Sequence, residues 1–195
     1  MKVLLEESRA EIIVKNSRFI SEAFPVETQA QAREKLHEIK QKYFDAAHVV
    51  HAFSVGLNSE TFGMSDDGEP SGTAGRPVLD VLKGSGITNI LITVTRYFGG
   101  TLLGTGGLVH AYSESAKEVL SVCKAEPYIE KTLFSFSCGY DLYQAVKHLF
   151  KEFNIFNLTE DFGTDISIHG EIFLSEKNSL IEQIKNISKG TVKCI

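Results

Sequence analysis

The chain of 195 residues carries a net charge of −5, and 43% of its residues are hydrophobic while 23% are charged. This is the composition of an ordinary globular protein, and it argues against a disordered chain and against a protein that coats nucleic acid with a broad basic surface. No stretch approaches the roughly 20 apolar residues of a membrane span, and the first residues lack a signal-peptide core. We therefore expect a cytoplasmic protein without membrane contact. Its three widely separated cysteines indicate neither a disulfide framework nor a zinc site.

The first part of the chain is predicted to mix strands and helices. Apolar segments at 11–15 and 18–24, with a turn at Asn16 and Ser17, indicate an opening hairpin. Thr28 and Gln31 form a capping box ahead of apolar residues at helical spacing, which predicts a helix. The elements expected next are a strand at 48–56, a loop at 66–77, a short helix at 77–84 ending at Gly84 or Gly86, a strand at 88–98, and a helix from Leu108 to Cys123 with Leu108, Tyr112, Ser115, Val119 and Val122 on one face.

The second part of the chain begins after segment 125–130, which contains Pro127 and is predicted to be a linker. The expected elements are a strand at 131–139, a helix at 142–154, strands at 155–163 and 165–174, a helix at 178–190 and a strand at 191–195. This order, βαββαβ, is typical of ferredoxin-like domains. The sequence thus predicts an α+β protein with a first domain at 1–125 and a second at 126–195.

All arginines lie in the first domain. They are Arg9, Arg18, Arg33, Arg76 and Arg96. Because arginine is suited to bidentate recognition of phosphate and carboxylate groups, this asymmetry places the expected chemistry in the first domain.

Arg96 is expected to point toward a packed side of the sheet, because it continues the strand parity of Ile90, Ile92 and Val94. A buried guanidinium without a partner is costly. Two alternatives satisfy it: a bound anion, or a carboxylate from Asp66, Asp67, Glu69 or Asp80.

A glycine-rich segment precedes the last helix of the first domain, with Gly99, Gly100, Gly104, Gly106 and Gly107. Amides at a helix N-terminus attract anions, so a phosphate could bind there. The Walker and dinucleotide signatures are nevertheless both absent, because no Lys-Ser or Lys-Thr pair follows and Val109 stands where a last glycine would belong. A tight connection is the other interpretation.

No catalytic or metal-binding constellation is complete. The loop at 66–77, called the acidic loop below, carries Asp66, Asp67 and Glu69 but lacks the ligand spacing of a calcium site. His48 and His51 are three residues apart on a strand, so their side chains face opposite sides of the sheet. Cys123 has no histidine nearby in sequence. We expect no metal, no cofactor and no catalytic residue.

Three segments, SDDGEPSGTAGRPVL, TNILITVTRYFGG and TLLGTGGLVHAY, together resemble the signature of the IMPACT family, in its bacterial, YigZ-like two-domain form. The resemblance implies an IMPACT N-terminal domain with the ribosomal-protein-like βαβ fold of elongation factor G domain IV, followed by a ferredoxin-like domain. It also implies a loose link to translation control and to RNA binding. The eukaryotic relatives carry an extra partner-binding domain that this chain is too short to contain, so that role is not transferred.

Two positions depart from the family pattern: Val50 stands where we expect cysteine, and His110 where we expect arginine. The first weakens thiol chemistry at that strand, and the second removes a positive charge near the glycine-rich segment.

We predict that the two signature loops, DDGEPSGTAGRP at 66–77 and RYFGG at 96–100, meet at one rim of the first domain and form a site for a phosphate or a nucleic-acid backbone. Arg76, Arg96, the loop amides and the hydroxyls of Ser71 and Thr73 would bind it, with the acidic residues orienting the arginines. The residues of this predicted site are Asp66, Asp67, Glu69, Ser71, Gly72, Thr73, Arg76, Arg96, Tyr97, Gly99, Gly100, Gly104, Gly106, Gly107 and His110. The alternative is a polar network that only pins the two loops together.

Three functions compete at this point. The first is an RNA- or ribosome-binding protein with a role in translation regulation. The second is an enzyme that acts on a phosphorylated small molecule at the glycine-rich loop, and the third is a regulator that docks proteins on its acidic second domain. The sequence leaves the RNA, the small molecule and the oligomeric state open.

Overall fold

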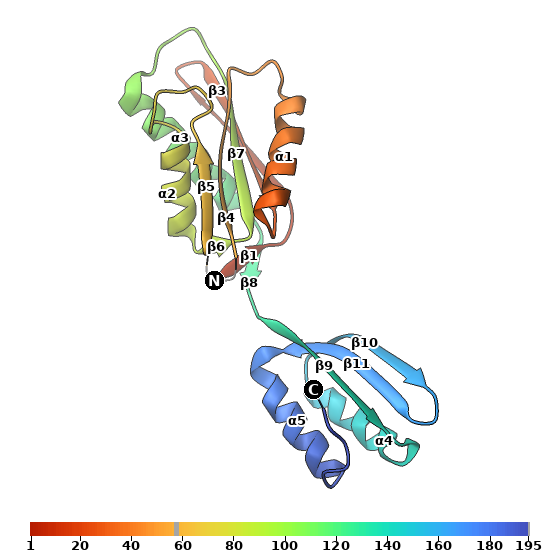
Figure 1. Ribbon diagram of the computed structural model, residues 1–195. Helices are drawn as coiled ribbons and strands as arrows, with labels where there is room; N and C mark the ends of the chain where they lie inside the picture. The colour runs from red at the N-terminus through yellow and green to blue at the C-terminus, as the bar shows by residue number, and fades with distance from the viewer. Residues whose placement is uncertain (57–58, 195) are drawn as a thin grey trace. The chain divides into compact units, whose positions relative to one another are not determined.

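The chain folds into two compact units, Met1–Tyr128 and Ile129–Ile195, each built from helices and strands (Figure 1). This computed structural model describes residues 1–56 and 59–194. The predicted two-domain α+β class is confirmed. Across the described residues, no helix combines the length and the apolar character needed to cross a membrane.

The first unit is built on a five-stranded antiparallel sheet with the order β2-β3-β7-β4-β5. Its strands are β2 (Ser8–Val14), β3 (Ser17–Pro25), β4 (His48–Val55), β5 (Thr61–Ser65) and β7 (Ile90–Tyr97). Helix α1 (Gln29–Lys42) covers one face, and α2 (Gly75–Ser85) and α3 (Gly104–Val122) cover the other (Figure 1). The result is a three-layer unit with β7 in the middle of the sheet.

The alternating side chains of β7 explain the two cores. Ile92 and Val94 join the core under α2 and α3, whereas Leu91 joins the core under α1. Helix α1 starts at the predicted capping box: the Gln31 amide donates to Thr28 Oγ1 at 3.2 Å, and the Thr28 amide donates to Gln31 Oε1 at 3.1 Å. The predicted strand parity of β7 and the predicted capping box of α1 are both confirmed. Each depends only on residues close together in the sequence.

The predicted opening hairpin is confirmed, but its turn lies one residue earlier than expected. Lys15 and Asn16 take φ of 45° and 65°, and Ser17 already pairs with Val14 in the sheet. A two-residue hairpin turn requires positive φ at both central positions, and Asn tolerates this better than Ser. The turn is therefore Lys15-Asn16 rather than Asn16-Ser17.

Four short strands were not predicted. Three of them form a small second sheet with the order β6-β1-β8: β1 (Lys2–Leu4), β6 (Ile87–Thr88) and β8 (Ala125–Pro127). The fourth, β5, extends the main sheet. The segment expected to be a linker at 125–130 thus contains a strand that pairs with the N-terminus. Strands of two or three residues carry no periodic pattern, so local sequence does not reveal them.

Helices α2 and α3 begin earlier than predicted, at Gly75 instead of Pro77 and at Gly104 instead of Leu108. Three of the five glycines in the glycine-rich segment therefore lie in the first turn of α3 and not in a loop before it. Helix α2 ends as expected, with Gly86 in the left-handed region at φ 69°. Along α3 the expected face is buried except for Val122, which is exposed at the last turn.

The second unit follows the predicted order except at its end. Its elements are β9 (Lys131–Cys138), α4 (Tyr140–Leu149), a 3-10 turn (Phe150–Glu152), β10 (Ile155–Phe162), β11 (Ile166–Phe173) and α5 (Leu174–Ile187). The sheet is antiparallel with the order β10-β11-β9. The strand predicted at 191–195 does not form over 191–194, and residue 195 lies outside the described residues. Val192 and Cys194 still pack against the core, so their apolar character serves packing rather than pairing.

Candidate functional site

Topology brings the two signature loops to the same end of the main sheet. β5 and β7 are both antiparallel to β4, which lies between them, so they run in the same direction and end at the same rim. That rim lies at the opposite end of the sheet from Met1 (Figure 1). The β2–β3 turn and the start of β4 also reach it, because Arg18 pairs with Tyr97 and His48 with Arg96.

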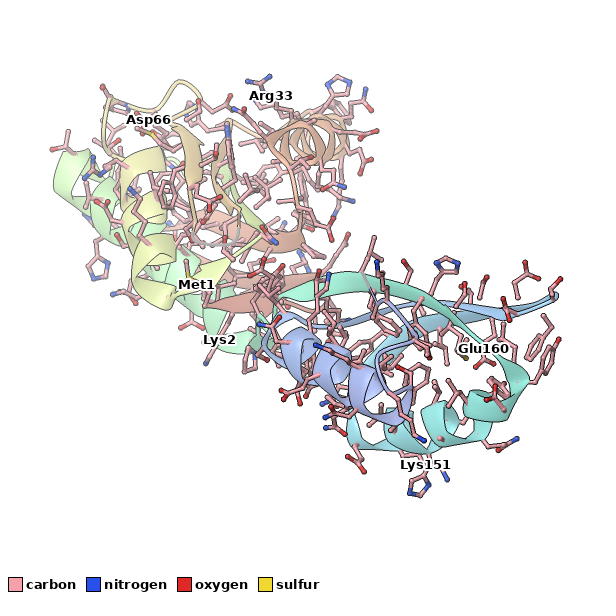
Figure 2. All side chains as sticks on the ribbon, turned by 60° about the horizontal axis from the view of Figure 1, so that its bottom comes forward. Met1, Lys2, Arg33, Asp66, Lys151 and Glu160 are labelled. Atoms are coloured by element: carbon pink, nitrogen blue, oxygen red, sulfur yellow. The ribbon has the colours of Figure 1, made fainter. Side chains whose placement is uncertain are left out.

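The acidic loop is held by its three carboxylates, each of which binds a different element. Asp66 accepts hydrogen bonds from the amides of Gly72 at 2.9 Å, Ala74 at 3.1 Å and Gly75 at 2.7 Å. It thereby caps the N-terminus of α2, whose N-cap residue Ala74 has no side chain that could do so. Figure 2 labels Asp66 beside this helix. Burial alone would raise the pKa of Asp66, but the three N–H donors outweigh it and hold the pKa below its ordinary value.

Asp67 ties the loop to β4 and α1. Its Oδ2 accepts from the Val49 amide at 2.7 Å, and its Oδ1 pairs with Lys40 Nζ. The Asp67 carbonyl oxygen lies 2.8 Å from His48 Nδ1. Burial alone would raise the pKa of Asp67, but Lys40 and the Val49 amide lower it by more, so its pKa lies below the ordinary value. Asp67 is therefore an ionised structural anchor.

Glu69 crosses from the acidic loop to the second signature segment. Its Oε1 accepts from Arg96 at 2.6 Å and from the Tyr112 hydroxyl at 2.8 Å. All three residues are buried. Burial, and next the charge of Glu69, raise the pKa of Tyr112, so its hydroxyl remains a donor. Of the two partners considered for Arg96, the structure thus contains the carboxylate.

The ion pair of Glu69 and Arg96 leaves some of their polar atoms without a hydrogen-bond partner among the described residues. Neither a donor to Glu69 Oε2 nor an acceptor for the buried Arg96 Nε is found among residues 1–56 and 59–194. His48 Nε2 lies 3.9 Å from Glu69 Oε2, which is beyond hydrogen-bond distance. The guanidinium lies against the rings of Phe19 and Phe98, with centroid distances of 5.6 and 5.7 Å. These contacts fix Arg96 in place while part of its hydrogen-bonding capacity stays unused.

A cavity of about 630 Å³ opens beside this pair. The acidic loop contributes Glu69 and Pro70, and β4 contributes His48. The segment after β7 and the start of α3 contribute most of the apolar wall, which includes Phe98, Leu102, Leu103 and Leu108. Phe98 is 52% exposed and Leu102 is 83% exposed, so both present apolar surface to solvent. The cavity thus has apolar walls around a buried ion pair.

A close backbone contact explains why the residue after Phe98 is a glycine. A Cβ on Gly99 would collide with the backbone of Asn16 in the β2–β3 turn, and the Gly99 amide donates to Ser17 Oγ at 3.2 Å. Gly75 has the same role at α2, where a Cβ would lie 2.7 Å from the carbonyl oxygen of Ser65. Both glycines permit close backbone approach, which packs the rim together.

Several residues of the predicted site do not line the cavity. Arg76 pairs with Asp80 on the exposed side of α2, with Nε 2.8 Å from Oδ1. Thr73 Oγ1 donates to the Pro70 carbonyl oxygen, and the Tyr97 hydroxyl donates to Asp45. The others that lie outside the cavity lining are Asp66, Asp67, Ser71, Gly72, Gly99, Gly100, Gly106, Gly107 and His110. The structure brings Glu69, Arg96 and Gly104 to the cavity, and it pairs both Arg76 and Arg96 with carboxylates.

The predicted site lacked three residues that line the cavity, His48, Phe98 and Leu102, and it lacked Tyr112, which donates a hydrogen bond to Glu69. Tyr112 carried the only usable signal, because a tyrosine on the buried face of a helix requires a partner for its hydroxyl. In the described part of the chain, no group of His, Cys, Asp and Glu side chains could hold a metal ion.

Comparison with known proteins agrees with this two-unit architecture. Residues 15–120 match the family model of the Impact N-terminal domain, and residues 136–191 match a domain of unknown function, DUF1949. The chain belongs to the IMPACT family. An IMPACT family member of Haemophilus influenzae is 39% identical over 166 residues, which cover 84% of this chain and 80% of that protein.

Two further relatives cover nearly the whole chain. The IMPACT family member YigZ of Escherichia coli is 29% identical over 184 residues, which are 93% of this chain and 90% of that protein. A crystal structure described as that of a hypothetical protein is similar with a TM-score of 0.73 and 27% identity, and it covers 100% of this chain and 95% of its own. The similarity thus extends over both units of this chain.

Proposed function

We propose that this protein acts in the regulation of translation as an RNA- or ribosome-binding protein, and that the rim cavity receives an unpaired base of RNA. The resemblance to the IMPACT family motivates the first half of the proposal. The second half rests on one observation: the half-exposed ring of Phe98 lies against the Arg96 guanidinium at the mouth of the cavity.

Single-stranded RNA is bound mainly through bases that splay out of the strand and stack on aromatic rings or guanidinium planes. Phe98 offers such a surface, since its ring is 52% exposed, and the apolar cavity lies next to it. The net charge of −5 gives the chain little general attraction to phosphates. Base stacking, rather than phosphate contacts, would then supply most of the affinity, and the dependence on salt would be shallow.

An enzyme of phosphorylated small molecules is less well supported by the geometry. Gly104 and Thr105, at the start of α3, line the cavity and offer backbone amides. Among the described residues that line the cavity, Arg96 is the only side chain with a fixed positive charge, and Glu69 already neutralises it. A phosphate would therefore meet a carboxylate beside its only guanidinium.

Co-sedimentation with ribosomes and their subunits over a salt series tests the proposal. We expect the protein to pellet with ribosomes, and Phe98→Ala to weaken this by about tenfold or more, as the loss of one stacked base would. Phe162→Ala is the matched control, because Phe162 is 55% exposed on β10 of the other unit. The proposal fails if the folded protein does not pellet at low salt, or if the two variants bind equally.

A further inference from the structure

The floor of the cavity holds an acceptor beside a donor. Glu69 Oε1 accepts two hydrogen bonds, from Arg96 and from Tyr112, whereas Oε2 accepts none from the described residues. Arg96 donates to Glu69 through Nη1, and its buried Nε has no partner among the described residues. The two side chains are only 3% and 7% exposed. Arg96 Nε is a buried donor without a partner, and buried polar groups are normally satisfied, so this unused capacity beside a cavity indicates a ligand.

The arrangement favours an uncharged, planar ligand. The charges of Glu69 and Arg96 cancel within one contact of 2.6 Å, so the floor attracts neither anions nor cations strongly. Tyr112 and Phe19 hold the carboxylate and the guanidinium from behind, which keeps them from turning toward solvent. A flat ring with hydrogen-bonding groups on its edge could insert between apolar walls and meet the pair edge-on.

We infer that the cavity selects guanine among the RNA bases, an inference that rests on the proposed function. Guanine presents the acceptor O6 next to the donors N1–H and N2–H₂. Arg96 donates to O6, as arginine commonly does in nucleic-acid recognition, while Glu69 Oε2 accepts from the neighbouring N–H groups. Phe98 stacks on the ring at the cavity mouth and contributes to affinity without distinguishing bases.

The other bases match the floor less completely. Adenine presents the donor N6–H₂ where guanine has the acceptor O6, and the acceptor N1 where guanine has the donor N1–H. It therefore matches the pair only after a shift of the ring, and it also lacks N2–H₂. Inosine has the guanine edge without that amino group, and it isolates the contribution of N2. Pyrimidines are smaller and fill less of a cavity of about 630 Å³. The expected order of affinity is guanine, then hypoxanthine, then adenine, with uracil weakest.

Fluorescence anisotropy with short single-stranded uridine RNAs tests this order. The RNAs carry guanosine, inosine, adenosine or no substitution at one central position. We expect the guanosine RNA to bind about tenfold or more tightly than the adenosine RNA, with inosine between them. Phe98→Ala should weaken the guanosine, inosine and adenosine RNAs alike and preserve their ratio. Glu69→Gln, checked for folding by circular dichroism, should remove most of the preference for guanosine.

The outcomes separate this inference from the function on which it rests. If all the RNAs bind equally, or if folded Glu69→Gln keeps the full guanosine preference, guanine selection is overturned while RNA binding stands. If no RNA binds but the protein pellets with ribosomes, guanine selection is overturned and ribosome binding stands. If neither RNA nor ribosomes bind, both proposals fail.

Discussion

Breaking the buried pair of Glu69 and Arg96 should destabilise the first unit strongly. Removing one partner of a buried ion pair costs about 3–5 kcal/mol, because the other charge is left in a poor solvent. Arg96→Met leaves the Glu69 carboxylate with only Tyr112, so we expect a loss in that range. Glu69→Gln keeps an acceptor oxygen for both donors but removes the charge, so we expect about 3 kcal/mol. The double variant should cost at least about 1 kcal/mol less than the sum, because the residues are in contact.

Urea unfolding followed by circular dichroism measures these free energies, and amide hydrogen exchange in β7 assigns the loss to the first unit. Asp80→Asn is the control, because it breaks an arginine–carboxylate pair of the same unit that is exposed on both sides. It should change the free energy of unfolding by no more than about 0.5–1 kcal/mol. A cost below about 1 kcal/mol for Arg96→Met, or strict additivity in the double variant, would refute the account of this pair.

Three further predictions follow from the same rim and from the sheet beneath it. Asp66→Ala should lower the free energy of unfolding by about 1–2 kcal/mol, because it removes the cap of α2. The pKa of Asp66 in the folded state lies below 3.8, so the stabilisation by its carboxylate is complete above that pH and is lost as the pH falls below it. Gly99→Ala should cost about 1–3 kcal/mol through the clash with Asn16, whereas Gly106→Ala, with no atom within 4 Å of its new Cβ, should stabilise α3 by about 0.5–1 kcal/mol. Burial, and next Lys40, lower the pKa of His51 from 6.5 to about 4, so its ring should stay neutral to about pH 4 and the folded state should lose stability as the pH drops between these values.

Each of these has a direct check. Urea unfolding at several pH values measures the Asp66 and glycine variants, and a capping loss that is the same at every pH, or a stabilising Gly99→Ala, would contradict the geometry. The ring resonances of His51 in an NMR titration report its pKa, and a midpoint near 6.5 would show that burial does not control it.

Local patterns predicted much of the fold. The capping box of Thr28 and Gln31 placed α1, and strand parity placed Arg96 on the side of the sheet that packs against α2 and α3. The short strands β1, β6 and β8 were not predicted, because they form by pairing with segments distant in the sequence and have no periodic pattern of their own. The start of α3 was misplaced because glycines were taken to end a loop, whereas three of them lie in its first turn.

The sequence predicted that the two signature loops meet, but not which contacts join them. Sequence identified Glu69 among the partners of Arg96, but it could not choose among the carboxylates, because that choice depends on how the loop is anchored. Asp66 is drawn to the amides of α2 and Asp67 to β4 and α1, which leaves Glu69 to reach the guanidinium. The cavity itself arises where β5 and β7 end at one rim, and no local pattern predicts its volume or its apolar lining.

The most direct test of the account is an NMR titration of the isotope-labelled protein with single-stranded RNA. Amide shifts report the binding surface residue by residue without any substitution. The account predicts that the changes concentrate on the cavity lining, at Gly68, Phe98 and Gly104, and that they are weaker in Phe98→Ala. Shifts confined to the second unit, or an unchanged cavity in the presence of bound RNA, would contradict it.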